Sequence, residues 1–457
     1  MPFENEFASY KPLWRVLSNP TVKNFIDRLY KRTYDRDEEE RKLTKLGADS
    51  LPKSSWLPNN IIAIDGGVQS VPVENGYPGS EIGYITVASV LIKLDRIKEL
   101  EQESIIDPRE FRKTEDPSSI DTVIPGQNVL LDEHTSPRVS MRKSLYETFK
   151  RTRIFSDGET LLDTYEALLK IKIDEAKTKE STAQNPIEGY EDNHLYYNFG
   201  EYTDIFSGQI LYSTDALRIH ELLDPNRSTG EMFGQIMSVM EKLWLVHILR
   251  SFEQGKMLSL LRDTAFFLDG PLAVFSTSAW LAPLIRRELS RINEIQKKTN
   301  GTDLVILGIE KTGTFRNHLS DLDTESDGSS GRIPARTAIL LDDAYIKKNI
   351  IFSTSPKPYG QDTYFGRKFF YKTKTGYLLV PVLATYDEHQ ASLATANPHQ
   401  YPRLGDVTAL LDEMVSNRYP DSVSPLISAH AEAAIPLSLG TKIFDEIARE
   451  IRNKHGC

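Results

Sequence analysis

Two aspartates each follow a short apolar run and precede a glycine. Asp65 follows residues 61–64, and Asp269 follows residues 265–268. An apolar run that stops at Asp-Gly is typical of a buried strand with a carboxylate at its end. If the two strands belong to one sheet, both carboxylates lie at the same edge, where they repel each other unless a cation joins them. Oxygen ligands suit Mg²⁺ or Mn²⁺, which activate water and stabilise phosphoryl displacement.

A third carboxylate would complete such a site if it lay on the helix between the two strands. Apolar residues at helical spacing predict that helix over 232–250, with a possible continuation through 251–261. Glu253 lies 269 − 253 = 16 residues before Asp269 and is the first candidate. Glu241, 28 residues before Asp269, is the alternative.

Three further residues have side chains suited to this chemistry. Lys311 directly follows an apolar run that predicts a third strand, so it could bind a phosphate, although a surface lysine is the ordinary interpretation. His430 lies in an apolar helix predicted over 424–435 and is either a metal ligand, an acid for the leaving group or a core residue. Tyr419 is more typical of a packing aromatic than of a catalytic hydroxyl.

The remaining elements predict an α/β protein. The apolar and β-branched residues of 82–94 predict a strand, which favours an antiparallel hairpin with 61–64. The pattern over 369–383 predicts a second hairpin. Arg367, just before this second hairpin, and Tyr371, in its first strand, could contact a nucleic acid, although these residues are also ordinary for an exposed hairpin. Residues 319–333 read as a polar loop.

The chain divides into three predicted parts. Residues 1–58 form a charged helical segment, residues 59–440 one α/β domain, and residues 441–457 a C-terminal helix, which we expect over 440–453. Within the domain, residues 95–230 are polar with little apolar periodicity, and we expect a long insertion with helical pieces outside the core.

The composition excludes several classes of protein and of site. The 457 residues carry 55 basic and 65 acidic side chains, a net charge of −10, which argues against a broad basic surface that wraps nucleic acid. The one cysteine, Cys457, excludes an internal disulfide framework, a thiolate zinc cluster and an iron–sulfur site. The sequence contains no GxxxxGK[ST] phosphate loop, GxSxG or HExxH. The absence of a signal-like start and of an 18-residue apolar stretch predicts a cytoplasmic protein without a membrane span.

Taken in chain order, these residues resemble the NurA nuclease family. That family has an Asp-Gly-Ser after its first strand, a helical glutamate after an arginine, a second Asp-Gly-Ser-Leu, a lysine after a strand, and late Tyr-Pro and Ala-His pairs. The counterparts here are Asp65-Gly66-Gly67, Arg250 with Glu253, Asp269-Gly270-Pro271-Leu272, Lys311, Tyr419-Pro420 and Ala429-His430. Gly67 and Pro271 stand where the family has serines, so any role of those hydroxyls is lost.

The resemblance implies an RNase H-like mixed β-sheet core flanked by helices, and a Mn²⁺- or Mg²⁺-dependent deoxyribonuclease. It implies that Asp65, Glu253, Asp269 and His430 hold the metal while Lys311 and Tyr419 position the scissile phosphate. It also implies a homodimer that acts on single- or double-stranded DNA ends with a HerA-type hexameric ATPase, in end resection or antiviral defence.

Three other interpretations remain open at this stage. A non-catalytic RNase H-like scaffold subunit of a DNA translocase would keep the fold without the activity. A glycosidase with an acid and a nucleophile would work in the presence of a chelator. For an α/β interaction protein, metal would change neither stability nor DNA binding.

Overall fold

The computed structural model divides into two compact units, Met1–Lys42 and Leu43–Cys457. It describes residues 11–29, 36–73, 76–94, 115–133, 135–176, 198–204, 208–224, 228–325, 327–415, 423–434 and 449. The described residues of the first unit form the helices α1 (Lys11–Ser18), α2 (Pro20–Asp27) and α3 (Arg36–Arg41). Asn19 caps α2 with its side chain, and Pro20 occupies the first helical position, where its missing N–H has no cost.

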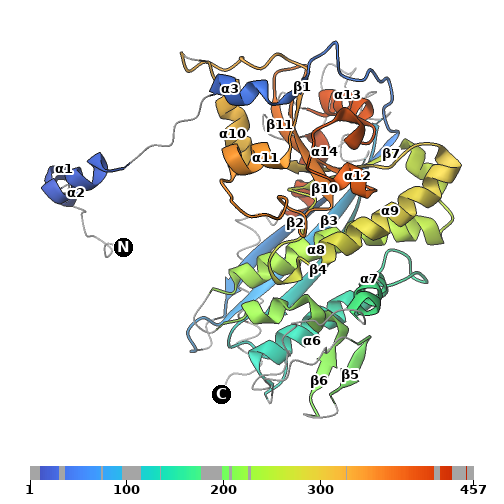
Figure 1. Ribbon diagram of the computed structural model, residues 1–457. Helices are drawn as coiled ribbons and strands as arrows, with labels where there is room; N and C mark the ends of the chain where they lie inside the picture. The colour runs from blue at the N-terminus through green and yellow to red at the C-terminus, as the bar shows by residue number, and fades with distance from the viewer. Residues whose placement is uncertain are drawn as a thin grey trace, which may run out of the picture. The chain divides into compact units, whose positions relative to one another are not determined.

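The second unit is built on a large mixed sheet (Figure 1). Among the described residues its order is β1 (Thr44–Leu46), β9 (Thr337–Leu340), β10 (Gly366–Lys372), β11 (Leu378–Ala384), β8 (Val305–Glu310), β7 (Thr264–Asp269), β2 (Asn60–Pro72), β3 (Glu81–Lys93) and β4 (Glu115–Pro125). A separate pair joins β5 (Glu201–Thr203) to β6 (Ile210–Tyr212). The predicted α/β class with a mixed sheet is therefore confirmed.

The centre of the sheet combines an antiparallel hairpin with two parallel strands. The predicted hairpin is confirmed, because β2 pairs with β3 along its whole length, from Asn60 opposite Lys93 to Pro72 opposite Glu81. On its other side β2 runs parallel to β7, which in turn runs parallel to β8. The first strand was predicted to end before Asp65, but it continues to Pro72 because β3 goes on pairing beyond the point where β7 ends.

Helices cover both faces of the sheet. One face packs on α6 (Pro137–Arg151), α7 (Leu161–Ala176), α8 (Gly230–Gln254) and α9 (Leu281–Asn300), and the other on α13 (Leu404–Met414) and α14 (Ser424–Ala433). Successive strand residues point to opposite faces, so Ile62 and Ile64 join the first core and Ile61 and Ala63 the second. A third cluster lies under α10 (Thr314–Asp323), near α11 (Asp343–Tyr345), and α12 (Glu388–Ala391) is a further short helix.

The expectation that residues 95–230 lie outside the core is wrong. Within this stretch β4 pairs with β3 in the main sheet, and α6 and α7 bury Phe149, Tyr165 and Leu169 in the larger core. Helix α6 buries polar residues such as Ser140, Arg142 and Thr148 together with its apolar ones, and this mixed composition hid its core side from the sequence argument. The predicted loop at 319–333 is also partly helical, because α10 extends to Asp323 and buries Leu319 and Leu322.

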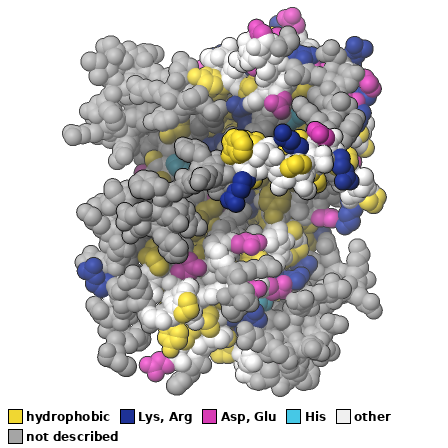
Figure 2. All heavy atoms as spheres, turned by 90° about the vertical axis from the view of Figure 1, so that its left-hand side faces the viewer, with side chains coloured by type: hydrophobic (Ala, Val, Ile, Leu, Met, Phe, Trp, Pro, Cys, Tyr) yellow, Lys and Arg dark blue, Asp and Glu magenta, His cyan; other side chains and the backbone are white. Residues whose placement is uncertain are grey.

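Other predictions have mixed outcomes. The long helix is confirmed as α8, and the second hairpin as β10 and β11. The helix expected over 440–453 lies outside the described residues except for position 449, and the domain boundaries stay predictions. In the described part of the chain, every helix is too short or too polar to cross a membrane. Figure 2 shows a face on which Lys and Arg side chains are interspersed with Asp and Glu among the described residues.

Candidate active site

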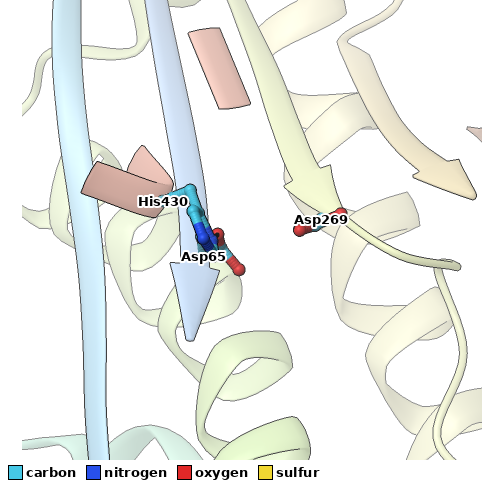
Figure 3. Close-up of side chains that lie close together, drawn as sticks. All are labelled: Asp65, Asp269 and His430. Atoms are coloured by element: carbon cyan, nitrogen blue, oxygen red, sulfur yellow. Dashed lines mark hydrogen bonds and ion pairs between the residues drawn. The ribbon is translucent and has the colours of Figure 1, made fainter. Parts of the chain in front are cut away.

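Strand register brings Asp65 and Asp269 together. β2 and β7 are parallel, with Ile64 opposite Leu268, so the next residue on each strand is an aspartate. Neighbouring strands lie about 4.8 Å apart, and residues in register point to the same face. Figure 3 shows the two carboxylates on adjacent strands, directed toward the space between them. The sequence predicted both aspartates at the ends of their strands. This holds for Asp269, which ends β7, but Asp65 lies within β2, which continues to Pro72.

His430 reaches the same place from α14. Its Nδ1 lies 2.9 Å from Oδ2 of Asp65, and its side chain is 64% exposed whereas that of Asp65 is 4% exposed. The helix approaches β2 closely, because a Cβ added at Gly67 would lie 2.4 Å from the carbonyl oxygen of Ala433. Ligand atoms of Asp65, Asp269 and His430 all lie within 4.8 Å of one another. Two carboxylates and an imidazole form a donor set that fits a divalent cation such as Mn²⁺.

The surroundings of Asp65 disfavour its negative charge. Burial, followed by the charges of Asp269 and Glu241, raises the pKa of Asp65 to about 6, and the hydrogen bond with His430 opposes this only in part. Asp65 Oδ1 also accepts the N–H of Gly66 at 2.8 Å. A cation at this point would relieve the repulsion between the carboxylates, which is the electrostatic signature expected of a metal site.

Glu241, the alternative third carboxylate, lies behind the aspartates on the α8 side of the sheet and is outside the group of ligand atoms formed by Asp65, Asp269 and His430. It projects from α8 toward Gly66, where an added Cβ would lie 2.5 Å from its Oε1. Its Oε2 lies 2.6 Å from Nζ of the buried Lys242. Burial raises the pKa of Glu241, as does Asp269, whereas Lys242 lowers it. Glu241 therefore adds a second layer of negative charge behind Asp65.

The structure does not bring Glu253, the first candidate, to this cluster. Its carboxylate forms a two-bond pair with Arg291 of α9, at 2.9 and 2.6 Å. Because α8 is one continuous helix, Glu253 lies 12 positions after Glu241, which corresponds to about 18 Å along the helix axis. Arg291 also pairs with Glu288, which in turn binds Arg250, so Glu253 belongs to a network of ion pairs between α8 and α9.

Lys311 is placed with the aspartates, and Tyr419 lies outside the described residues. The Lys311 Nζ donates to Asp269 Oδ2 at 2.8 Å, and both side chains are about one quarter exposed. This position follows from the register, since β8 runs parallel to β7 and Lys311 comes directly after Glu310 at its end. Because the Lys311 ammonium group is partly exposed, it can donate a hydrogen bond to a phosphate oxygen.

The suggested nucleic-acid contacts of Arg367 and Tyr371 are wrong, because both side chains are buried. Arg367 is 1% exposed and donates to backbone carbonyls, including those of Leu341 and Thr395. The Tyr371 hydroxyl donates to Asp412 at 2.9 Å. The sequence argument took this hairpin as exposed, but β10 lies inside the sheet between β9 and β11.

Sequence reasoning missed a cavity of about 500 Å³ next to the aspartates. Its lining includes Asp269, Lys311, Glu310, Lys368 and several aromatic side chains. The signal was present in part, since Glu310 and Lys311 form a charged pair directly after an apolar strand. The partner of Glu310, Lys368, comes from a strand more than 50 residues later, and only the folded sheet reveals that pairing.

Fold and site together define an α/β protein with a carboxylate–imidazole cluster at the centre of a mixed sheet. Residues 59–435 match the NurA domain, and the chain therefore belongs to the NurA family. No curated protein matches the chain. Solved structures similar to it include the NurA nuclease from Sulfolobus solfataricus, with 10% identity, 98% of each chain covered and a TM-score of 0.31. A NurA structure with manganese has 10% identity, 97% of this chain and 99% of that chain covered, and a TM-score of 0.24.

Proposed function

We propose that this chain is a divalent-metal-dependent deoxyribonuclease whose metal is held by Asp65, Asp269 and His430. The observation that carries the proposal is the convergence of three ligand atoms within 4.8 Å in a chain of the NurA family. The solved family members named above include a nuclease and a complex with manganese, and the proposal assigns the same activity and metal class to this chain. We infer that Glu241 takes the place of Glu253 as the third carboxylate, because Glu241 lies against Gly66 and Glu253 is paired with Arg291.

Each residue has a distinct task in this proposal. When bound, Mn²⁺ or Mg²⁺ lowers the pKa of water and offsets the charge that develops on the phosphate. Asp65 and Asp269 hold the cation, and the Lys311 ammonium neutralises and orients the scissile phosphate. His430 bonds to Asp65 through Nδ1, which leaves Nε2 to bind the cation or to pass a proton to the leaving oxygen. Tyr419 stays a candidate for positioning the phosphate on the strength of the sequence alone.

The wider setting is part of the same proposal. The meander of β2, β3 and β4, extended by parallel β7 and β8, supports an RNase H-like core. Family membership supports a cytoplasmic homodimer that works on DNA ends with a HerA-type ATPase, in end processing or antiviral defence. The chain has no phosphate loop of its own, so ATP-driven movement along DNA would come from that partner.

Digestion of labelled linear and single-stranded DNA tests the activity. We expect cleavage by the wild-type chain with Mn²⁺ or Mg²⁺, none with EDTA, and a loss of at least about a hundredfold in Asp65→Ala and Asp269→Ala. Glu253→Gln serves as the control, because it removes a carboxylate from α8 that is paired with Arg291 and lies outside the cluster. Absence of cleavage even with the ATPase bound would favour the scaffold alternative, and cleavage that persists in EDTA would contradict the metal mechanism.

A further inference from the structure

The cavity beside the aspartates is continuous with the candidate active site. Asp269 and Lys311, which bind each other at 2.8 Å, form part of its wall. Its volume of about 500 Å³ falls within the range of sites that hold one small molecule or one nucleotide. Any group held in this cavity would therefore be within reach of a phosphate at Lys311.

Aromatic side chains form much of the wall. Phe275, Phe315, Tyr359 and Tyr364 all line it. Their rings form a connected set: Phe275 and Tyr364 have centroids 5.6 Å apart, and Tyr359 and Tyr364 have centroids 5.4 Å apart. Phe275 is 43% exposed, so part of its surface remains available to a ligand. Aromatic surface in a site next to a phosphate-binding lysine suits a base that stacks on it.

The charged groups of the wall balance one another. Lys368 Nζ lies 2.6 Å from Glu310 Oε1, and both side chains are at most one tenth exposed. The Lys368 ammonium also lies 3.6 Å from the centroid of the Phe315 ring and 3.3 Å from the Tyr359 hydroxyl. With Asp269 paired to Lys311, the four charges that line the cavity sum to zero. A neutral ring with polar edges fits this environment better than a second phosphate does.

We propose that this cavity holds the terminal base of an unpaired DNA strand, stacked on Phe275 with its edge toward the nearly perpendicular ring of Tyr364, and with its phosphate at Lys311. This inference rests on the proposed nuclease activity and specifies its substrate. A base that is still paired and stacked in a duplex cannot enter such a cavity, so an end must be melted first. The site therefore prefers single-stranded ends, and it takes a duplex end more slowly, after the terminal base pairs have opened.

The test uses the full chain and a single-stranded oligonucleotide with 2-aminopurine at one terminus, since stacking quenches the fluorescence of this base. Titration is done in EDTA, so that binding is read without cleavage. We expect quenching for a label at one of the two ends and none for a paired terminal base. Phe275→Ala should weaken this binding by about five- to a hundredfold.

Phe155→Ala is the matched control, because Phe155 is 44% exposed and does not line the cavity. It should quench as the wild type does. Equal quenching in Phe275→Ala and wild type, or no quenching in wild type at either end, would overturn the inference. The two proposals can fail independently. Mn²⁺-dependent cleavage together with unchanged quenching in Phe275→Ala would contradict the base-binding cavity and support the nuclease. Quenching that depends on Phe275, without cleavage in the presence of any metal, would contradict the nuclease activity and support the base-binding cavity.

Discussion

Asp65 illustrates how a binding site is maintained at the expense of stability. Its carboxylate is buried between two other negative groups, Asp269 and Glu241, and its pKa is raised to about 6. A raised pKa means that the folded chain favours the protonated acid more than the unfolded chain does. At neutral pH the ionised carboxylate therefore destabilises the metal-free fold, and a bound cation would reverse the sign of this contribution.

The substitution Asp65→Asn should reveal both effects. Without metal we expect it to raise the free energy of unfolding by up to about 2–3 kcal/mol above pH 6, with the gain lost below about pH 4, where the wild-type acid is protonated in both states. With Mn²⁺ present, the wild type should gain stability and the variant should not. Thermal unfolding in EDTA and in Mn²⁺ measures this. A variant that Mn²⁺ stabilises as much as the wild type would show that Asp65 is no ligand.

The two helical glutamates should respond differently to neutralisation. Glu241→Gln removes a charge next to Asp65, and we expect Mn²⁺ affinity to fall by about ten- to a hundredfold, as for other groups directly behind metal ligands. Glu253→Gln breaks only the pair with Arg291, which is 41% exposed, so its effect on stability should be at most about 1 kcal/mol. Calorimetric titration with Mn²⁺ compares them. The opposite order of affinities would return the third-carboxylate role to Glu253.

At the scale of elements, the approach of α14 to β2 decides whether His430 reaches the aspartates. By the resemblance drawn from the sequence, Gly67 corresponds to a serine of the family, and the carbonyl oxygen of Ala433 occupies the space that a side chain would need. The backbone of α14 therefore fills the space that a serine side chain would take at this position. A sequence can show that glycine replaces serine, but it cannot show which helix fills the gap.

Gly67→Ala should push α14 away from the strand. The added Cβ would meet the Ala433 oxygen at 2.4 Å, so we expect weaker Mn²⁺ binding with every ligand side chain intact. Gly234→Ala is the control, because this helical glycine has open space around its Cβ position and alanine favours the helix by up to about 1 kcal/mol. Metal titration and thermal unfolding compare the two variants. Unchanged Mn²⁺ affinity in Gly67→Ala would contradict the role given to α14.

Local patterns predicted the central elements well and the long-range contacts poorly. The apolar runs before Asp65 and Asp269 predicted the strands, and the parallel register then brings the two carboxylates together. The choice between Glu241 and Glu253 depends on which part of α8 lies against Gly66, and the spacing along the chain does not show this. Residues 95–230 were misjudged for a similar reason, because β4, α6 and α7 become core only when they meet β3 and α8.

The whole second unit should lose stability in mild acid through its buried histidines. Burial lowers the pKa of His247 to about 4 and that of His220 to about 3, so each must stay neutral in the fold. His247 Nδ1 lies 2.7 Å from the Thr164 hydroxyl and thereby joins α8 to α7. Below the unfolded pKa of about 6.5 the unfolded chain binds the extra proton, so stability falls as pH falls from 6.5 to 4.

Protonation of His247 in the unfolded chain accounts for a loss of about 3 kcal/mol in the free energy of unfolding between pH 6.5 and pH 4. The variant His247→Gln should not show this loss. Asp65 acts in the opposite sense between pH 6 and 4, and it does so equally in both proteins, so the comparison isolates the histidine. Denaturant unfolding at several pH values in EDTA is the measurement. A slope that is identical in wild type and variant would place the acid sensitivity elsewhere in the chain.

The central claim is that Asp65, Asp269 and His430 hold a divalent cation, and crystals grown or soaked with Mn²⁺ test it most directly. Anomalous scattering at the manganese edge locates the ion without reference to activity. The account predicts a peak within about 2.2 Å of an oxygen of each aspartate and of a nitrogen of His430. A peak at Glu253, or no peak at the cluster at saturating Mn²⁺, would contradict it.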